Sequence, residues 1–405
     1  MPIFVGAGNS TFLSAGASKG VGVGIGTTNT AGRNAGVGTA TGTLIYNKTS
    51  GSVEIWNGTG WESIQSAFTA TGGNVLNAST PGNGFKYHTF TSSGSFTVTT
   101  GSKSCEILVV GAGGGGGSNN NSGGSDGGAG GGGGGVVLAS QTINPGTYNI
   151  TIGSGGSGGT SGNASQNTNP VNQQAGLCSP SKSQPYSGTA GTPGGDSIFG
   201  ASSPTAVKLT AKGGGGGGSG PNAGNEDCGG CGGGAGSGGS PGTVGGNALQ
   251  PGQNASFTGT LTTNVGFKGG DSPGTSPFRG AGGGGTAGAG SNGSSGGPGV
   301  GGPAVTVPSD YGAPTIGLPG LNPVSTRFGA GGGGGDGGPS YQGTVAPGGS
   351  GGGGDGARQN VDATSGAQNG SGGGGGAGIT GKPSTDPNGS GAAGGLGLIV
   401  IKYLA

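Results

Sequence analysis

The chain has 405 residues, and 120 of them are glycine, which is about four times the ordinary usage. Hydrophobic residues make up only 27% of the chain and charged residues 7%, with a net charge of +1. These values exclude a conventional hydrophobic core of matching size and charge-driven disorder. They also give no electrostatic reason to expect nucleic acid or an anionic membrane as a partner. No stretch reaches the roughly 20 consecutive apolar residues of a membrane span, so no membrane insertion is expected.

Residues 1–42 are small, polar and rich in glycine, alanine and threonine. We expect an extended N-terminal attachment arm with one or two short strands. The first residues, MPIFVGAGNSTF, have neither the basic region nor the long apolar region of a secretory signal. A surface location would therefore require another route, such as the release of virus particles by lysis.

Residues 43–65 predict a small three-stranded β meander. The segment TLIYNKTSGSVEIWNGTGWESI alternates apolar and polar residues in three short runs, and an Asn-Gly turn lies within 57–60. The expected packing residues are Ile45, Val53, Ile55, Trp56 and Trp61. The two tryptophans fit a core or inter-subunit contact, with sugar stacking as the alternative. Residues 66–86 are predicted to be a linker.

A β-sandwich is predicted from residues 87–212 together with 395–405. Runs rich in Val, Ile, Thr and Tyr with period-two alternation favour strands at 89–91, 95–99, 105–110, 136–143, 147–153, 196–200 and 206–211. The fourth and fifth of these runs predict a hairpin about Pro145 and Gly146. The C-terminal LIVIK is typical of a buried central strand and is expected to pair with EILVV. The glycine-rich region would then be an insertion between strands of one sandwich.

Uninterrupted glycine runs return throughout residues 111–397, for example at 111–117, 213–218 and 329–335. Glycine chains can form the extended threefold polyproline II helix, which has no internal hydrogen bonds. Runs lying side by side can hydrogen-bond to one another because no side chains keep the backbones apart. Residues 213–394, joined by the excursion 111–135, are therefore predicted to form a polyglycine II bundle with variable loops. Disordered low-complexity spacer is the alternative.

The expected fold class is all-β plus a polyglycine II helix bundle, with the threefold helices inserted into a β-sandwich. No α-helix is expected, because no segment combines helix caps with a 3.6-residue period. Alternating outward and returning runs would place four tips remote from the sandwich, at 118–126, 221–228, 336–347 and 379–390. Residues 303–328 and 357–369 are expected nearer to the sandwich.

The sequence contains no recognisable catalytic constellation, so we expect neither an enzyme nor a cofactor. The single histidine, His88, lies in a predicted strand, and the 13 acidic residues are scattered. Cys228 and Cys231 form a CGGC motif that supplies at most half of a zinc site. No metal is therefore expected, and a local disulfide or two idle thiols are the alternatives for this pair.

Binding of a receptor by surface shape is the function that remains, because loops on a rigid frame can vary without disturbing the frame. The expected receptor contacts are polar and aromatic residues of the predicted tips. They are Asn119, Asn120, Asn121, Glu226, Asp227, Tyr341, Gln342, Lys382 and Asp386. Each of them also fits the description of an ordinary exposed loop residue.

Several segments resemble the glycine-rich domain that is common in bacteriophage tail-fibre proteins. They are FTVTTGSKSCEILVVGAGGGGG, YNITIGSGG, GGDSIFG, KLTAKGGGGGG and GLGLIVIKY. TLIYN and VEIWNGTGW are similar to a short β motif of phage structural proteins, cyanophages included. The tail-tip adhesins of some T-even-like phages also pack polyglycine II helices and bind host receptors through loops at the far end. Residues 1–86 depart from those adhesins.

The resemblance implies a virion tail-fibre or tip adhesin, located in the virion and extracellular after lysis. Its partners would be a host-cell surface receptor, either a glycan or an outer-membrane protein, and other tail or baseplate proteins held by the N-terminal arm. Phage fibres are often trimeric, so a homotrimer is expected. One alternative is a non-adhesive structural protein, such as a capsid or tail decoration or a filament subunit. Another is an ice-binding protein, against which the mixed bulky tips argue.

Overall fold

The structure is a computed structural model in which the chain divides into two compact units, Met1–Thr69 and Ala70–Ala405. Both units are built mainly of β-strands, which confirms the all-β class. The residues described are 25–64, 68–76, 82–119, 127–160, 189–201, 208–219, 229–237, 243–250, 254, 257–272, 279–312, 326–337, 345–358, 361–368, 373–375 and 389–405.

The first unit contains a four-stranded sheet in the order β1-β2-β3-β4. Its strands are β1 (Gly26–Thr28), β2 (Leu44–Asn47), β3 (Ser52–Trp56) and β4 (Trp61–Ile64). Strands β2 to β4 form the predicted meander, and β1 adds a fourth strand from the predicted arm by pairing in parallel with β2. The two tryptophan rings lie across from each other on β3 and β4, with centroids 5.6 Å apart.

The expectation that the chain contains no α-helix is wrong, because α1 (Thr30–Gly36) follows β1. The side chain of Asn29 caps this helix by accepting a hydrogen bond from the backbone N–H of Gly32 at 2.7 Å. Arg33 anchors the helix through an ion pair of 2.8 Å with Glu54 of β3. Seven residues are too few to show a helical period, so the sequence carries no signal for this helix.

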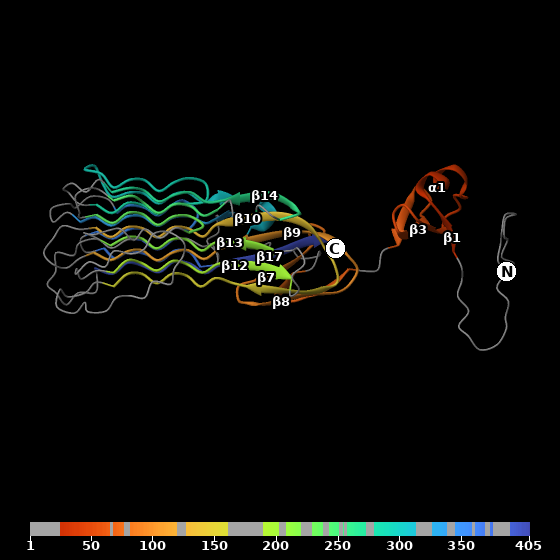
Figure 1. Ribbon diagram of the computed structural model, residues 1–405, viewed down its shortest axis with the longest axis horizontal. Coiled ribbons are helices and arrows are strands. Elements are labelled where there is room, and N and C mark those ends of the chain that lie inside the picture. Colours follow the sequence, from red (N-terminus) through yellow and green to blue (C-terminus); the bar gives the residue numbers. More distant parts are fainter. Residues whose placement is uncertain are drawn as a thin grey trace. The chain divides into compact units, whose positions relative to one another are not determined.

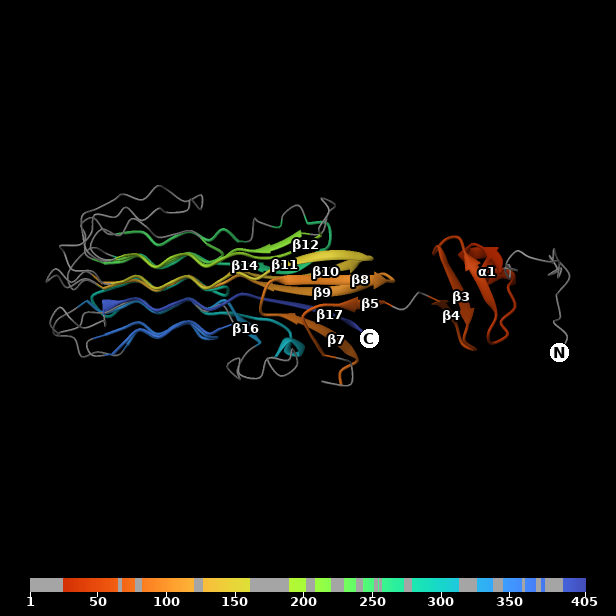
Figure 2. The same cartoon turned by 90° about the horizontal axis from the view of Figure 1, so that it is seen from below.

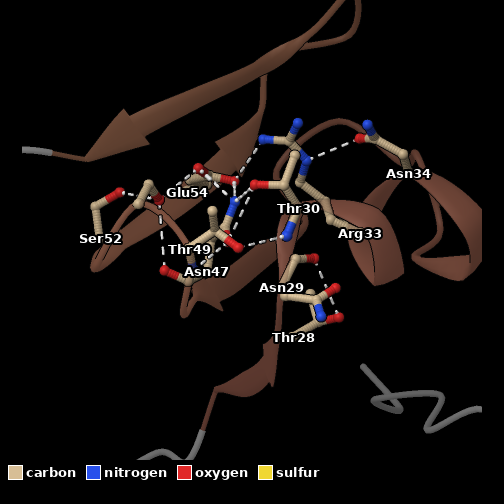
Figure 3. Close-up of polar contacts among 10 residues, drawn as sticks. Thr28, Asn29, Thr30, Arg33, Asn34, Asn47, Thr49, Ser52 and Glu54 are labelled. Atoms are coloured by element: carbon tan, nitrogen blue, oxygen red, sulfur yellow. Dashed lines mark hydrogen bonds and ion pairs between the residues drawn. The ribbon is translucent and has the colours of Figure 1, made fainter.

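A polar network fills the space between α1 and the sheet, as Figure 3 shows. Glu54 and Asn47 are both buried, and the Asn47 amide donates to the Glu54 carboxylate at 3.0 Å. Burial alone would raise the pKa of Glu54, but hydrogen bonds from Arg33, Ser50 and Asn47 hold it below its ordinary value. The interior of the first unit is therefore polar and ionised.

The second unit contains two large sheets. The six-stranded sheet has the order β14-β10-β9-β17-β7-β6, with β6 (Asn74–Leu76), β7 (Phe85–Phe90), β9 (Lys103–Val110), β10 (Val136–Ile143), β14 (Thr260–Val265) and β17 (Leu398–Leu404). The five-stranded sheet has the order β13-β12-β11-β8-β5, with β5 (Thr69–Thr71), β8 (Gly94–Thr100), β11 (Gly146–Thr151), β12 (Ser197–Ala201) and β13 (Lys208–Ala211). A short pair consists of β15 (Val305–Thr306) and β16 (Arg327–Phe328), and a single 3-10 turn, η2 (Ser309–Tyr311), follows β15.

The C-terminal strand lies inside the six-stranded sheet, and the predicted pairing of LIVIK with EILVV is confirmed. Strand β17 runs antiparallel to β9, with Leu398 opposite Val110 and Ile401 opposite Ile107. The two ends of the glycine-rich region are therefore held by adjacent strands of one sheet.

Three expectations about the strands are wrong. Residues 66–86 are more than a linker, because β5 and β6 each add a strand to one of the large sheets. Strand β14 lies within the segment predicted to be bundle only, and it pairs with β10. Strands β10 and β11 do not form a hairpin, because the turn at Asn144 and Pro145 carries the chain from the six-stranded sheet to the five-stranded one.

The two large sheets face each other across an apolar core in which His88 of β7 is buried. Its ring packs edge-on against Phe96 of the opposite sheet, with centroids 5.0 Å apart. Its Nδ1 lies 2.7 Å from the carbonyl oxygen of Gly72, and its Nε2 lies 3.0 Å from the hydroxyl of Tyr403. Both ring nitrogens thus have hydrogen-bond partners inside the sandwich, which is the structural role that the sequence favours.

Burial lowers the pKa of His88, although the hydrogen bond to Gly72 acts in the opposite direction. The unfolded chain therefore takes up a proton near pH 6.5 that the folded chain still refuses, so the free energy of unfolding should fall as the pH drops below about 6.5. The loss should approach 1.4 kcal/mol per pH unit at most. Because the chain has one histidine, denaturant titrations of the wild type and of His88→Gln from pH 7.5 to 5.5 isolate this effect. A wild-type profile as flat as that of the variant would contradict it.

The outer face of the six-stranded sheet is covered where the glycine runs begin. Tyr311 and Phe328 are fully buried there in an apolar cluster with Leu108. The Tyr311 hydroxyl donates to Glu106 at 3.0 Å, and the Lys402 ammonium lies 2.6 Å from the same carboxylate. The segments that contain Tyr311 and Phe328 are thus attached to the sheet by both apolar and charged contacts.

Glycine runs extend side by side from the ends of the strands and form the bundle (Figures 1 and 2). Within 111–119, each backbone N–H donates to one of three neighbouring runs in turn, and every third residue returns to the same neighbour. The donors Gly111, Gly114 and Gly117, for example, reach the carbonyls of Gly135, Gly132 and Ala129 at 2.8–2.9 Å. A repeat of three residues with hydrogen bonds only between runs is the geometry of polyglycine II.

Five of the described runs each hydrogen-bond to six neighbouring runs. They are 111–119, 127–135, 279–285, 329–337 and 373–375, and they consist almost entirely of glycine. Six neighbours around each run make a hexagonal lattice in cross-section. Most of the uninterrupted glycine runs of the sequence therefore lie inside this lattice, whereas the run at 213–218 hydrogen-bonds to four described runs.

The perimeter run 153–160 carries a side chain at every third position. In 153–160 the glycines face inward, while Ser154, Ser157 and Thr160 are exposed. The outward backbone N–H groups of this run also find partners, because Ser157 donates to the hydroxyl of Thr192 at 2.7 Å. A repeat of two glycines and one other residue thus suits a run at the perimeter, because its side chains point to solvent.

Candidate functional site at the far end of the bundle

We call the end of the bundle opposite the sheets the far end. Runs that follow β9, β11, β13 and β14 lead toward it, and runs that precede β10, β12 and β17 return from it (Figures 1 and 2). Because the lattice fixes the direction and the neighbours of every described run, it also fixes where each connecting segment starts and ends.

The predicted tips 118–126 and 379–390 are the first and the last along the chain, and the described residues that flank both of them lie at the far end. The backbone N–H of Asn119 donates to the carbonyl of Gly389 at 3.1 Å, so the end of the first outward run lies beside the start of the last returning run. The segments 120–126 and 376–388 themselves lie outside the described residues. Their flanking residues agree with the prediction that 118–126 and 379–390 are remote from the sandwich.

The residues that flank 338–344 also lie at the far end. The N–H of Asp336 donates to Ala357 at 3.0 Å, and the N–H of Gly356 donates to Ala346 at 2.9 Å. The outward run that ends after Asp336 and the returning run that starts before Ala346 thus meet at one place, in agreement with the prediction for 336–347.

The assumption that outward and returning runs alternate fails in the middle of the chain. Cys231 and Gly234 accept hydrogen bonds from Gly215 and Gly218, so runs 213–219 and 229–237 are parallel neighbours. Ser219 therefore lies at the far end and Gly229 near the sheets. Residues 221–228, predicted as a remote tip, lie outside the described residues, and their two flanks are at opposite ends of the bundle.

Two further segments were assigned to the sandwich end by the same alternation. The described parts of 303–328 do lie there, because Tyr311 contacts Glu106 of β9. Residues 357–369 are wrongly placed in part, since Arg358 and Val361 exchange hydrogen bonds of 3.0–3.1 Å in a turn at the far end. The alternation fails because 213–219 and 229–237, which are consecutive among the described runs, point in the same direction.

The structure corrects one predicted receptor contact. Asn119 is only 5% exposed, because the glycine lattice continues two residues beyond the run at 111–117 and encloses it. A side chain enclosed in this way does not reach a receptor. The other predicted contacts lie outside the described residues, namely Asn120, Asn121, Glu226, Asp227, Tyr341, Gln342, Lys382 and Asp386.

Sequence reasoning missed a buried ion pair that organises the far end. Arg279 and Asp336 are each 3% exposed, and Nε of the guanidinium lies 3.4 Å from the carboxylate. The same guanidinium donates to the carbonyls of Ser294 and Ser295 at 3.2 and 2.5 Å. Both charged residues directly adjoin a pure glycine run, in FRGAGGGG and GAGGGGGDGG, and that position is the one signal the sequence offers.

Arg279 links three separate connections through these contacts. It starts the run that follows 273–278, its guanidinium holds the turn at 294–297, and its partner Asp336 ends the run that precedes 338–344. A charge-assisted network buried among backbones without side chains restricts how these connections leave the lattice. The far end is therefore a surface whose loops start from fixed points.

The cysteines of the CGGC motif were the other candidates from the sequence, and the described part of the chain shows no reactive thiol and no metal site. Cys231 is a buried free thiol inside the lattice, and burial raises its pKa to about 12, while Cys228 lies outside the described residues. Within the described part of the chain, no group of three or more histidine, cysteine, aspartate or glutamate side chains could hold a metal ion. Nor does the described chain include a helix that is long and apolar enough to cross a membrane.

Comparison with known families agrees with this architecture. The sequence profile of a family described as glycine-rich domain matches residues 89–404, which is more than half of the chain. The chain belongs to this family. The matched residues of the glycine-rich domain start in β7 and end in β17, so they include the bundle and both large sheets apart from β5, β6 and the first residues of β7. None of the curated proteins compared with the chain matches it.

Proposed function

We propose that the protein is a tail-fibre or tail-tip adhesin of a bacteriophage that binds a receptor on the host surface through the loops at the far end of the bundle. The observation that carries this proposal is the hexagonal lattice of glycine runs, which is held at one end by two sheets and from whose other end the segments 120–126, 338–344 and 376–388 start. A lattice of this kind is stiff because most of its interior backbone N–H groups are hydrogen-bonded to a neighbouring run. Such a lattice would hold the loops at its far end at a constant distance from the sheets, whatever the sequence of the loops.

Binding is favoured over catalysis because the loops of the far end start from fixed points, and loops on a rigid scaffold usually carry recognition. The receptor would be a glycan or an outer-membrane protein. In this proposal the N-terminal arm of the first unit connects the adhesin to other tail or baseplate proteins, and the particle carries it as a homotrimer outside the cell after lysis.

Replacing the far-end segments 338–344 and 376–388 by glycine-serine linkers of equal length should abolish binding of the labelled protein to host cells. Thermal unfolding should stay unchanged, because the replaced residues start after the buried Asp336 and end before Gly389. The matched control is the same replacement of 313–325, whose flanking residues lie near the sheets, and it should bind normally. Full binding by the far-end variant would favour a fibre or decoration subunit with passive tips.

A further inference from the structure

Three charged side chains meet on the outer face of the six-stranded sheet, beside the 3-10 turn η2. Lys402 of β17 lies opposite Glu106 of β9 in the sheet, and Asp310 belongs to η2. The Lys402 Nζ lies 2.6 Å from a carboxylate oxygen of Glu106 and 2.6 Å from one of Asp310. One amine thus contacts two carboxyl groups, and one of these is 92 residues away along the chain.

The amine of this cluster is shielded from water. The Lys402 side chain is only 5% exposed. Its Nζ lies 4.8 Å from the ring centroid of Phe85 and 5.0 Å from that of Tyr311. Charged groups that are kept from water in this way are costly unless they are fully paired. The cluster therefore differs from a surface ion pair, in which both groups stay hydrated.

The two carboxyl groups are not equally well satisfied. Glu106 also accepts a hydrogen bond of 3.0 Å from the Tyr311 hydroxyl. Asp310 contacts Lys402 through Oδ2, whereas its buried Oδ1 has no hydrogen-bond partner among the residues that the structure describes. The surroundings thus stabilise the ionised form of Asp310 less than that of Glu106. An uncharged carboxyl group is the better electrophile, so Asp310 is the group that the amine can attack.

We propose that Lys402 and Asp310 condense to form an amide bond within the chain, with Glu106 carrying protons between them. Glu106 takes one proton from the ammonium, and the lone pair of Nζ then attacks Cγ of Asp310. Two of the three ammonium protons leave with one Asp310 oxygen as water, one proton stays on the amide nitrogen, and Glu106 ends as a carboxylate. No oxidant or activating group is needed, and one buried charge of each sign disappears.

Contact and burial make this condensation feasible. Burial lowers the pKa of Lys402, but the hydrogen bonds and charges of Asp310 and Glu106 outweigh it and raise the pKa. The unreacted cluster is therefore an ion pair, and Glu106 is in place to take the proton. Groups held in reactive contact can behave as if at concentrations on the order of 10⁵–10⁸ M. The Asp310 side chain is 27% exposed, so the released water can leave.

The bond would tie the last strand of the six-stranded sheet to the segment that covers it. Strand β17 and η2 could then not separate even where their hydrogen bonds break. This covalent link lies at the sheets and is independent of receptor binding at the far end of the bundle.

Mass spectrometry of the denatured full-length chain tests the proposal. The wild type should weigh one molecule of water less than its sequence. A proteolytic digest should contain one joined pair of peptides, which includes Asp310 and Lys402. The digest is needed because an aspartate followed by glycine, such as Asp336, can also lose water by closing on its own backbone. That reaction joins no peptides.

A second ion pair is the control within the same molecule. Lys212 and Asp196 also have charged atoms 2.6 Å apart, but their side chains are 27% and 32% exposed. Because both groups stay hydrated, their peptides should remain separate. If these peptides were joined to the same extent, close contact alone would be sufficient and the role assigned to the shielded cluster would be wrong.

Two variants test the roles of the carboxyl groups. Glu106→Gln keeps the shape of the side chain but cannot take the proton, so the folded variant should have its full mass and separate peptides. Circular dichroism reports whether it folds. If it does not, Asp310→Ala decides, because this partly exposed position tolerates alanine and the variant should also have its full mass. Separate peptides in the wild type, a joined pair in folded Glu106→Gln, or a water deficit that persists in Asp310→Ala would each overturn the proposal.

Discussion

Replacing Gly131 by alanine should destabilise the second unit by about 3 kcal/mol or more. Gly131 lies in an interior run, where its N–H donates to Gly374 and its carbonyl accepts from Gly332. A Cβ added there would lie 2.2 Å from the carbonyl oxygen of Gly114, with further backbone atoms of the same run within 2.7 Å. Because the obstacle is backbone that is itself bonded to other runs, no side chain can rotate away to make room.

Gly297→Ala is the matched control for this prediction. Gly297 lies in the turn at 294–297, where an added Cβ meets no atom within 4 Å. Its free energy of unfolding should change by less than about 0.5 kcal/mol. Denaturant unfolding of both variants, followed by circular dichroism, provides the measurement. Similar effects of the two substitutions would mean that the interior runs are not in backbone contact.

Replacing Arg279 by methionine should lower the free energy of unfolding by about 3–5 kcal/mol. Methionine fills a similar volume, but the Asp336 carboxylate would then remain buried without its cation. The carbonyls of Ser294 and Ser295 would lose the same donor. Amide hydrogen exchange in the turn at 294–297 should accelerate as well, because Arg279 holds two carbonyls of this turn.

Two further variants separate the charge effect from a general loss of packing. Arg279→Met combined with Asp336→Leu removes both charges and should recover part of the stability, since an apolar pair can replace a buried ion pair. Lys268→Met removes a charge whose partner Asp271 lies 3.1 Å away at an exposed site. It should change stability by less than about 1 kcal/mol. A double variant that is no more stable than the single one would contradict the role assigned to the ion pair.

Much of the second unit could be predicted from the sequence, because its signals are local and repeated. The short apolar runs EILVV and LIVIK are sufficient to identify β9 and β17 as buried strands, and the flanking glycine runs indicate that they hold an insertion. Uninterrupted glycine directly indicates a backbone without steric barriers to lateral hydrogen bonding. The all-β class and the bundle follow from these two signals.

The parts that could not be predicted depend on contacts between distant residues. Helix α1 exists because Asn29 caps it and Arg33 reaches Glu54, 21 residues further along the chain. The turn at Pro145 could lead back to the same sheet or across to the other, and only the packing of Tyr148 and Phe96 in one sheet decides it. The direction of a glycine run carries no signal at all, since the threefold helix hydrogen-bonds to parallel and antiparallel neighbours alike.

The location of the candidate site could be predicted from the sequence, but most of the residues that form it could not. Counting passes from β9 and from β17 locates the first and last tips at the far end. Asn119 was misassigned because a short polar stretch after a glycine run gives no sign of where the lattice stops. Arg279 and Asp336 are separated by 57 residues, so no local pattern could pair them.

The perimeter side chains have a consequence for solubility. A hexagonal array of hydrogen-bonded backbones could in principle keep accepting strands at its margin, as exposed sheet edges do in aggregation. The hydroxyl-bearing residues Ser154, Ser157 and Thr160 stand at the outward positions of one marginal run and prevent another backbone from docking there. Because these side chains recur at every third residue, they keep a further glycine run, including one from another molecule, from adding to this side of the bundle.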